Sequence, residues 1–282
     1  MSVSPWRGRD LGTRTVAYTE RDAILYALAV GARASDLDLV YEEHLRVLPT
    51  FGLTLAQWAP DALGALGAFD VTTAVHGAQR LLVRGPLPRS GELTTHARVA
   101  EVWDKGSAAV FEVEVTSEYF VATWSLFAPG CGGFDGDRGP SAPARAEGAA
   151  ARRLSVDTHH RQAALYRLLG DRHAMHMDPA AARAAGMPRP FLHGLCSLAA
   201  TTLVLAPSLG AHPAELAELD ARFAAPVFPG DRLDVTALPD GNGAVRFQAW
   251  AEGRTALSGG RARFRSAPPT GGHPTQEENP DA

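Results

Sequence analysis

Apolar residues in the first half of the chain follow the spacing of one helix and then the alternation of several strands. Residues 22–32 (DAILYALAVGA) repeat apolar side chains on one helical face and approach an end at Gly31, which predicts a helix. Residues 48–52 (LPTFG) predict a turn. Near-alternating stretches with many β-branched residues predict strands at residues 93–102, 108–117 and 119–127. A glycine-containing hairpin turn is predicted between the first two of these strands.

The second half repeats this arrangement after a change of composition. Residues 129–151 are rich in Gly, Pro and Ala, which predicts a linker or long loop. Residues 193–205 (HGLCSLAATTLVL) predict a buried helix, and residues 163–169 a short helical or extended run. Extended segments are predicted at residues 221–229, 233–238, 244–252 and about 255–264.

A similar Pro/Gly corner leads into a strand in each half, at residues 86–93 and 226–233, which suggests an internal duplication. We therefore expect an α+β chain in which a curved antiparallel sheet wraps a helix, twice. The polar, proline-rich end predicts a disordered tail. The expected division is an N-terminal repeat at residues 1–135, a linker at 136–153, a C-terminal repeat at 154–268 and the tail at 269–282.

Composition narrows the class of protein. The 282 residues are 45% hydrophobic, which is enough for a sizeable core, and the formal net charge of −4 argues against a nucleic-acid partner. The longest apolar stretches are far shorter than the ~20 residues of a membrane span, so no membrane association is expected. Two distant cysteines, Cys131 and Cys196, make no disulfide framework, which indicates a reducing cytoplasm.

The densest polar cluster lies between residues 166 and 179 and suits elimination of water from a 3-hydroxyacyl thioester. That reaction needs a base for the α-proton, an acid for the leaving hydroxyl and a donor for the enolate-like oxygen. Asp171 and His176, five residues apart in an irregular segment, suit the first two roles. Gly194, at the start of the predicted buried helix, offers a backbone N–H for the third.

Each residue also has a structural interpretation. His173, His176 and Asp178 have spacing that metal ligands tolerate, although no thiolate joins them. Asp171 fits a turn or an N-cap, and Asp178, followed by proline, fits the N-cap of a short helix at residues 179–185. Cys196 fits a core thiol. Spacing alone leaves catalysis and structure both open.

The same cluster resembles the signature of the type-two, MaoC-like (R)-specific enoyl-CoA hydratases, which include the hydratase part of peroxisomal multifunctional enzymes. That signature is roughly Tyr-x-x-x-Gly-Asp-x-Asn-Pro-Leu-His-x-Asp, followed by Pro-x-x-His-Gly-Leu-Cys. The matching residues are Tyr166, Gly170, Asp171, His176, Asp178, Pro190, His193, Gly194, Leu195 and Cys196. Further matches lie at residues 26–28, 48–52, 76–77, 86–88, 104–107, 132–134 and 222–231, so the resemblance covers both halves.

The resemblance implies a double hotdog fold, with the acyl chain held in the N-terminal repeat and catalysis in the C-terminal repeat. It implies Asp171 and His176 as the acid/base pair around a water and the Gly194 amide at the thioester oxygen. It also implies a homodimer, a CoA-type thioester substrate and R stereochemistry at the hydroxyl carbon. We expect no cofactor beyond the CoA or phosphopantetheine that carries the substrate, and no metal, because no thiolate or third spaced ligand joins the cluster. Supporting and substrate-binding positions expected with them are His173, Tyr166, His193, His76 and Gly77.

The chain departs from the signature at two positions. His173 stands where the family has Asn, and Ala174 where it has Pro, so the support of the acid/base pair is altered. Three hypotheses follow. The first is a hydratase or dehydratase acting on a CoA or acyl-carrier-protein thioester, with a role in fatty acid or specialised metabolism. The second is a cyclase in which a substrate hydroxyl replaces water (oxa-Michael addition), and the third is a thioester-binding protein without activity.

Overall fold

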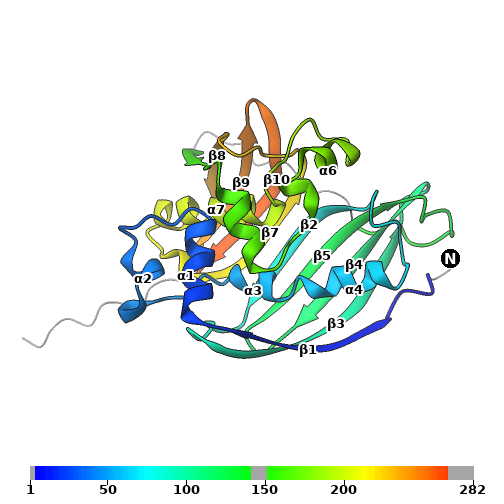
Figure 1. The fold of residues 1–282 in the computed structure, drawn as a ribbon, viewed down its shortest axis with the longest axis horizontal. Coiled ribbons are helices and arrows are strands. Elements are labelled where there is room, and N and C mark those ends of the chain that lie inside the picture. Colours follow the sequence, from blue (N-terminus) through cyan, green and yellow to red (C-terminus); the bar gives the residue numbers. More distant parts are fainter. Residues whose placement is uncertain (1–3, 141–150, 266–282) are drawn as a thin grey trace, which may run out of the picture.

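The computed structural model describes residues 4–140 and 151–265. Within them, ten strands form one antiparallel sheet in the order β1-β3-β4-β5-β2-β7-β10-β9-β8-β6 (Figure 1). The first half supplies β1 (Asp10–Tyr18), β2 (Val75–Val83), β3 (Gly91–Asp104), β4 (Ala108–Thr116) and β5 (Phe120–Pro129). The second supplies β6 (Arg152–Asp157), β7 (Leu216–Phe223), β8 (Arg232–Pro239), β9 (Ala244–Ala251) and β10 (Arg254–Phe264).

The strand order confirms the predicted internal duplication. Each half places its first strand at an outer edge and its second strand at the centre, so that β1-β3-β4-β5-β2 corresponds to β6-β8-β9-β10-β7. The two halves meet where β2 pairs with β7 in antiparallel register from Ala78↔Arg222 to Leu82↔Glu218. One continuous sheet therefore carries both repeats and brings their helical segments to neighbouring positions.

Helices fill the segment between the first and second strand of each half. The first half holds α1 (Glu20–Ala29), α2 (Leu37–Val40), η1 (Glu42–His44), α3 (Phe51–Leu55) and α4 (Trp58–Ala65). The second holds α5 (Gln162–Tyr166), η2 (Arg167–Leu169), η3 (Ala174–His176), α6 (Pro179–Ala184), α7 (Gly194–Ser208) and η4 (Pro213–Glu215), where η marks a 3-10 helix. Figure 1 shows α4 lying across the first-half sheet.

The long helix α7 confirms the buried helix predicted at residues 193–205. Leu198, Ala199, Ala200 and Leu205 are fully buried, and each buried leucine contributes about 1.5–3 kcal/mol relative to an exposed one. Helix α7 lies against α1, since the Cys196 thiol is 3.4 Å from a carbonyl oxygen of that helix. The two repeats thus share one core, and α7 presents its N-terminus to the space between them.

The turn predicted at residues 48–52 is confirmed at its start, where the N–H groups of Phe51 and Gly52 donate to the backbone oxygens of Leu48 at 2.9 Å and Pro49 at 3.1 Å, and it leads directly into α3. Phe51 and Gly52 already belong to α3, and a Cβ on Gly52 would lie 2.5 Å from the Phe120 ring. Gly52, predicted as part of the turn, is therefore also needed for the close packing of α3 on the strand that carries Phe120. The pattern also missed β1, β2 and α4.

The segment predicted as a linker is partly structured. Asp104 accepts hydrogen bonds from the N–H groups of Gly133 (2.9 Å) and Gly136 (3.3 Å), which hold residues 130–140 against the β3–β4 turn. Strand β6 begins at Arg152, two residues before the predicted return of structure at Leu154. The middle of the linker, residues 141–150, and the predicted tail at 269–282 lie outside the described residues. Among the described residues, no helix has the length and apolar character needed to cross a membrane.

Candidate active site

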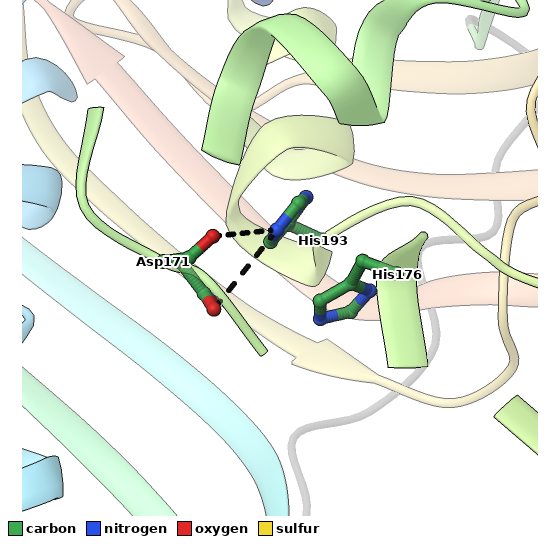
Figure 2. Close-up of side chains that lie close together, drawn as sticks. All are labelled: Asp171, His176 and His193. Atoms are coloured by element: carbon green, nitrogen blue, oxygen red, sulfur yellow. Dashed lines mark hydrogen bonds and ion pairs between the residues drawn. The ribbon is translucent and has the colours of Figure 1, made fainter. Parts of the chain in front are cut away.

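The candidate site is built from two short segments of the second half, the irregular stretch after η2 and the start of α7. Gly170 ends η2 with φ 149°, a conformation that side chains rarely adopt, and so turns the chain into Asp171. His176 ends η3, and His193 is the residue before the first turn of α7. Figure 2 shows Asp171, His176 and His193 converging from these segments.

Asp171 is held as a buried carboxylate. Its side chain is 15% exposed, and one of its oxygens, Oδ1, accepts hydrogen bonds from His173, from Nδ1 at 2.5 Å and from the backbone N–H at 3.2 Å. Burial works to raise the pKa of Asp171, but the bond from His173 and the nearby imidazoles of His193 and His176 outweigh it and hold the pKa well below the usual range. The bond from the His173 N–H confirms the predicted turn role of Asp171, and its catalytic role stays a prediction.

His176 is fixed in one tautomer by its neighbour. Its Nδ1 lies 2.9 Å from the carbonyl oxygen of Phe191, which can only accept, so Nδ1 carries the hydrogen. In the neutral ring Nε2 then keeps its lone pair. Burial lowers the pKa of His176 against the opposing charge of Asp171, which favours this neutral form. His176 is therefore set up as a proton acceptor at Nε2.

His193 completes the cluster and links it to the predicted Tyr166. Its ring lies 3.8 Å from that of His176 and 4.7 Å from that of Tyr166, centroid to centroid. Its Nε2 donates to the backbone oxygen of Asp171 at 3.2 Å, and burial lowers its pKa to about 3. Tyr166 is itself 1% exposed. His193 therefore packs against His176 and bonds Asp171, and Tyr166 lies behind it in the core.

Gly194 lies where the predicted oxyanion donor should be. It is the first residue of α7, whose first N–H groups have no acceptor within the helix, and the hydrogen bonds of the described residues include none from its N–H. A Cβ at Gly194 would lie 3.0 Å from the Phe223 ring. The missing side chain therefore allows Phe223 to pack against the helix end.

The predicted His76 and Gly77 lie at the seam between the repeats. The β2–β5 pairing shifts register between His76 and Ala78, so Gly77 is the extra residue of a bulge. The His76 ring packs 4.8 Å from Phe223, and burial lowers its pKa to about 4 against the opposing charge of Asp171. His76 is thus brought close to Asp171 from the other repeat.

The metal-ligand set considered from spacing does not form. Asp178 accepts the Ala180 N–H at 2.8 Å as the N-cap of α6, which confirms its predicted capping role. The donors that lie within 4.8 Å of one another are instead those of Asp171, His176 and His193. One carboxylate and two imidazoles are ligand types that zinc accepts, so these three are the residues that could hold a metal.

Sequence reasoning missed two contributors. Asp61 comes from α4 of the first repeat, and its Oδ1 lies 4.0 Å from Nε2 of His173. Phe223, at the end of β7, covers Gly194 and His76. Nothing in the local sequence marks Asp61, whereas Phe223 belongs to a stretch that matched the family signature. Cys196 is a core residue as predicted, and burial raises the pKa of its thiol to about 12.

Comparison with family models divides the chain in the same way as the duplication. Residues 16–123 match the MFE-2 hydratase 2 N-terminal domain, and residues 142–257 match the MaoC like domain. The candidate catalytic residues all fall within the second match.

Three curated relatives are similar over most of this chain. Enoyl-CoA hydratase ChsH3 of Mycobacterium tuberculosis is 35% identical, with 84% of this chain and 89% of the relative covered. The 3-hydroxyacyl-thioester dehydratase Y of the same organism is 34% identical, with 88% and 93% covered. The peroxisomal hydratase-dehydrogenase-epimerase of Neurospora crassa is 36% identical over 88% of this chain, which spans 30% of that longer protein.

Solved structures agree with these relatives. The crystal structure of a MaoC-like dehydratase from Phytophthora capsici matches with a TM-score of 0.81 and 26% identity, covering 93% of this chain and 96% of that one. A Mycobacterium tuberculosis protein described as a double hotdog matches with a TM-score of 0.60 and 16% identity, covering 92% and 96%. The α+β double hotdog fold implied by the sequence resemblance is confirmed.

Proposed function

The chain belongs to the MaoC-like enoyl-thioester hydratases, and on that premise we propose that it is a hydro-lyase that interconverts a 2-enoyl thioester and its (3R)-hydroxyacyl thioester. The catalytic residues are Asp171 and His176, with the Gly194 amide at the thioester oxygen. One observation carries this assignment: a buried carboxylate and a neutral imidazole converge on a single position beside an unoccupied helix-end N–H.

The separation of the acid/base pair suits one water molecule. A carboxylate oxygen of Asp171 and a ring nitrogen of His176 lie within 4.8 Å of each other. Two hydrogen bonds of about 2.8 Å that meet at a tetrahedral angle span about 4.5 Å. A water placed there bonds Nε2 of His176 and the carboxylate of Asp171 at once, with both of its hydrogens engaged and its lone pairs free to attack.

In the hydration direction, the water oxygen forms a bond to Cβ of the enoyl thioester as His176 Nε2 takes one water proton. The C=C electron pair moves towards the thioester carbonyl, and the Gly194 N–H, aided by the α7 dipole, stabilises the negative oxygen. The ionised Asp171 holds the remaining O–H and stabilises the imidazolium. His176 then returns the proton to Cα, which leaves a neutral 3-hydroxyacyl thioester and a free pair.

Turnover of a simple thioester tests this proposal. Purified protein is mixed with crotonyl-CoA and with longer enoyl-CoAs, and loss of the conjugated enoyl absorbance is followed. Hydration with a (3R) product, read out by an R-specific dehydrogenase, is expected. The absence of conversion at every chain length, with Asp171→Asn indistinguishable from wild type, would remove the assignment.

The carrier of the acyl chain, the lack of a cofactor, the oligomeric state and the cellular location are part of the same proposal. The acyl chain is carried on CoA or an acyl carrier protein, as expected for relatives named enoyl-CoA hydratase and 3-hydroxyacyl-thioester dehydratase. No cofactor or metal takes part, so activity should survive exhaustive chelation. The working form is a homodimer in the cytoplasm; light scattering tests the first, and cell fractionation the second. Both cysteines are free, which accords with a reducing compartment.

A further inference from the structure

We propose that Arg189 and Arg254 form a binding site for the phosphate group on the pantetheine arm that carries the acyl thioester. The inference rests on the proposed function and adds the part of the substrate that lies away from the reacting carbons. Arg189 lies in the segment between α6 and α7, and Arg254 is the first residue of β10. Neither residue belongs to the catalytic cluster.

The two guanidinium groups are held at one place by the same two residues. The Arg189 Cζ lies 4.5 Å from the centroid of the Phe228 ring, and the Arg254 Cζ lies 5.2 Å from it. The Nη2 atom of each arginine also lies 3.7 Å from a different oxygen of the Asp231 carboxylate. Asp231 is 8% exposed and accepts the Phe228 N–H at 3.0 Å, so the platform under both arginines is rigid.

Arg189 and Arg254 are held in place, but their side-chain N–H donors are not used in hydrogen bonds within the described residues. A distance of 3.7 Å is longer than a hydrogen bond, and among the described residues neither guanidinium donates one. The cation–π contacts with Phe228 engage no N–H group in a conventional hydrogen bond, so the N–H donors stay available for another acceptor. The two side chains are 56% and 42% exposed, so those donors are reachable from solvent.

The charges at this place favour an anion. Two guanidinium groups face one carboxylate, which leaves an excess of one positive charge. Paired guanidinium edges bind the oxygens of a phosphate ester in a bidentate manner, which a single ammonium cannot do. Exposed guanidinium pairs repel each other unless an anion is bound between or beside them, and the buried Asp231 compensates only one of the two.

The site lies at a suitable distance from the chemistry. Arg189 is four residues before His193, so their Cα atoms lie within roughly 14 Å even if the chain is fully extended. The Leu192 N–H bonds the Val227 oxygen at 2.8 Å, which keeps the Phe228 segment alongside the approach to α7. A pantetheine arm is an extended chain that separates the thioester from its phosphate, and it can join the Gly194 amide to this arginine pair.

Binding measurements test the site without requiring turnover. Pantetheine, 4′-phosphopantetheine and CoA are titrated by calorimetry into the full-length protein at low salt. The variants are Arg189→Gln and Arg254→Gln, with Arg98→Ala as the control because it removes a similarly exposed arginine that pairs with Glu114 in the first repeat. Wild type should bind the phosphorylated ligands at least about tenfold more tightly than pantetheine, and each Gln variant should lose about tenfold.

The outcomes separate the sources of the phosphate. A full gain with 4′-phosphopantetheine supports the assignment to the phosphate that CoA and carrier proteins share, whereas a gain with CoA alone would overturn it in favour of the remaining CoA phosphates. Equal affinity for all three ligands in wild type would overturn the proposal, as would variants that weaken pantetheine and CoA alike. In parallel, KM for crotonyl-CoA should rise about tenfold in each Gln variant while KM for crotonyl-N-acetylcysteamine and both kcat values stay unchanged.

That parallel arm keeps the two proposals distinct. If wild type hydrates neither thioester, the proposed hydro-lyase function fails, and the calorimetric comparison still decides whether the arginines bind phosphate. Turnover of the truncated thioester by the variants shows that their fold is intact. An Arg189→Lys variant keeps the charge but not the fork of donors, and should recover only part of the affinity.

Discussion

Asp171 and His173 are joined twice at a single carboxylate oxygen. Oδ1 of Asp171 accepts from His173 Nδ1 at 2.5 Å and from the His173 backbone N–H at 3.2 Å. The other ring nitrogen of His173 lies 4.0 Å from Asp61 of the first repeat. The histidine that replaces the asparagine of the family signature therefore supports the Asp171 carboxylate and connects it to a second carboxylate across the repeat boundary.

The contact between Asp171 and His173 should make the free energy of unfolding depend on pH. The hydrogen bond to Asp171 and the charges of Asp171 and Asp61 raise the pKa of His173 above its usual value. A group whose pKa is raised on folding stabilises the folded protein below its unfolded pKa of about 6.5, and loses that effect as pH rises through the folded value. His173→Asn should therefore cost about 1 kcal/mol or less near pH 6, because the side chain is half exposed, and less at pH 9.

Denaturant unfolding of wild type and His173→Asn at both pH values measures this difference. His96→Asn is the control. His96 also contacts an aspartate and its side chain is 47% exposed, but it belongs to β3, in the first repeat. A His173→Asn penalty that grows towards pH 9 would contradict the prediction.

Removing the charge of Asp171 should abolish most activity and leave the fold. Asp171→Asn is expected to lower kcat by about 10²–10⁴, because the amide no longer stabilises the imidazolium of His176. Asp178→Asn is the matched control: it lies in the same segment, but its side chain caps α6, and Asn caps as well as Asp. Comparable losses in the two variants would indicate a structural effect on the whole segment.

The parts predictable from sequence are those whose cause is local. The apolar run of α7 and the Asp178-Pro179 cap could be predicted because burial and capping chemistry are carried by adjacent residues. The role of Gly52 could not, because the Phe120 ring that requires it arrives from a strand 68 residues later, 120 minus 52. A local pattern contains no information about such a neighbour.

The same distinction holds at the site. Asp171, His176 and Gly194 were found through their chemistry and through a family signature, and the structure brings them together. Asp61 has no signal in its own helix, because it reaches the site through pairing of the two repeats. Comparison with the family signature shows that His173 replaces an asparagine, but only the fold shows which groups that side chain contacts.

The fall of kcat/KM at low pH should follow the protonation of His176. Burial lowers the pKa of this imidazole, and the reaction needs its neutral form to accept a proton. As pH falls through that lowered value, His176 becomes protonated and kcat/KM should fall, with a midpoint below about 6.5. A profile of kcat/KM from pH 4 to 9 measures the midpoint, with unfolding followed at each pH. A midpoint above 7 would contradict the assignment of His176 as a buried base.

Adding one methyl group at Gly194 should slow the reaction. A Cβ there would lie 3.0 Å from the Phe223 ring, so Gly194→Ala forces the ring or the helix end to shift. Because loss of one oxyanion donor costs about 10²–10³ in kcat, a displaced amide should cost tenfold or more. Phe223→Leu in the same chain relieves the contact and should recover part of kcat. If Gly194→Ala keeps full activity, the amide is not the donor to the thioester oxygen.

The source of the oxygen in the product separates hydration from ring closure. His173 changes the support of the position assigned to water, so a substrate hydroxyl is a second nucleophile to consider for the same Asp171/His176 pair. Turnover in ¹⁸O-labelled water, followed by mass spectrometry, should place one labelled oxygen on Cβ of crotonyl-CoA. A substrate with a hydroxyl within reach of its own enoyl carbon offers the competing route within one molecule.

The product of such a substrate should also carry the label if the water held between Asp171 and His176 is the nucleophile. The Asp171 carboxylate and His176 Nε2 each accept one hydrogen of that water, whereas an alcohol has only one hydroxyl hydrogen to donate. His173→Asn, which returns the support residue to the family signature, should not change the labelled fraction. An unlabelled cyclic product from wild type, converted to a labelled open product by His173→Asn, would instead identify His173 as the residue that selects the nucleophile.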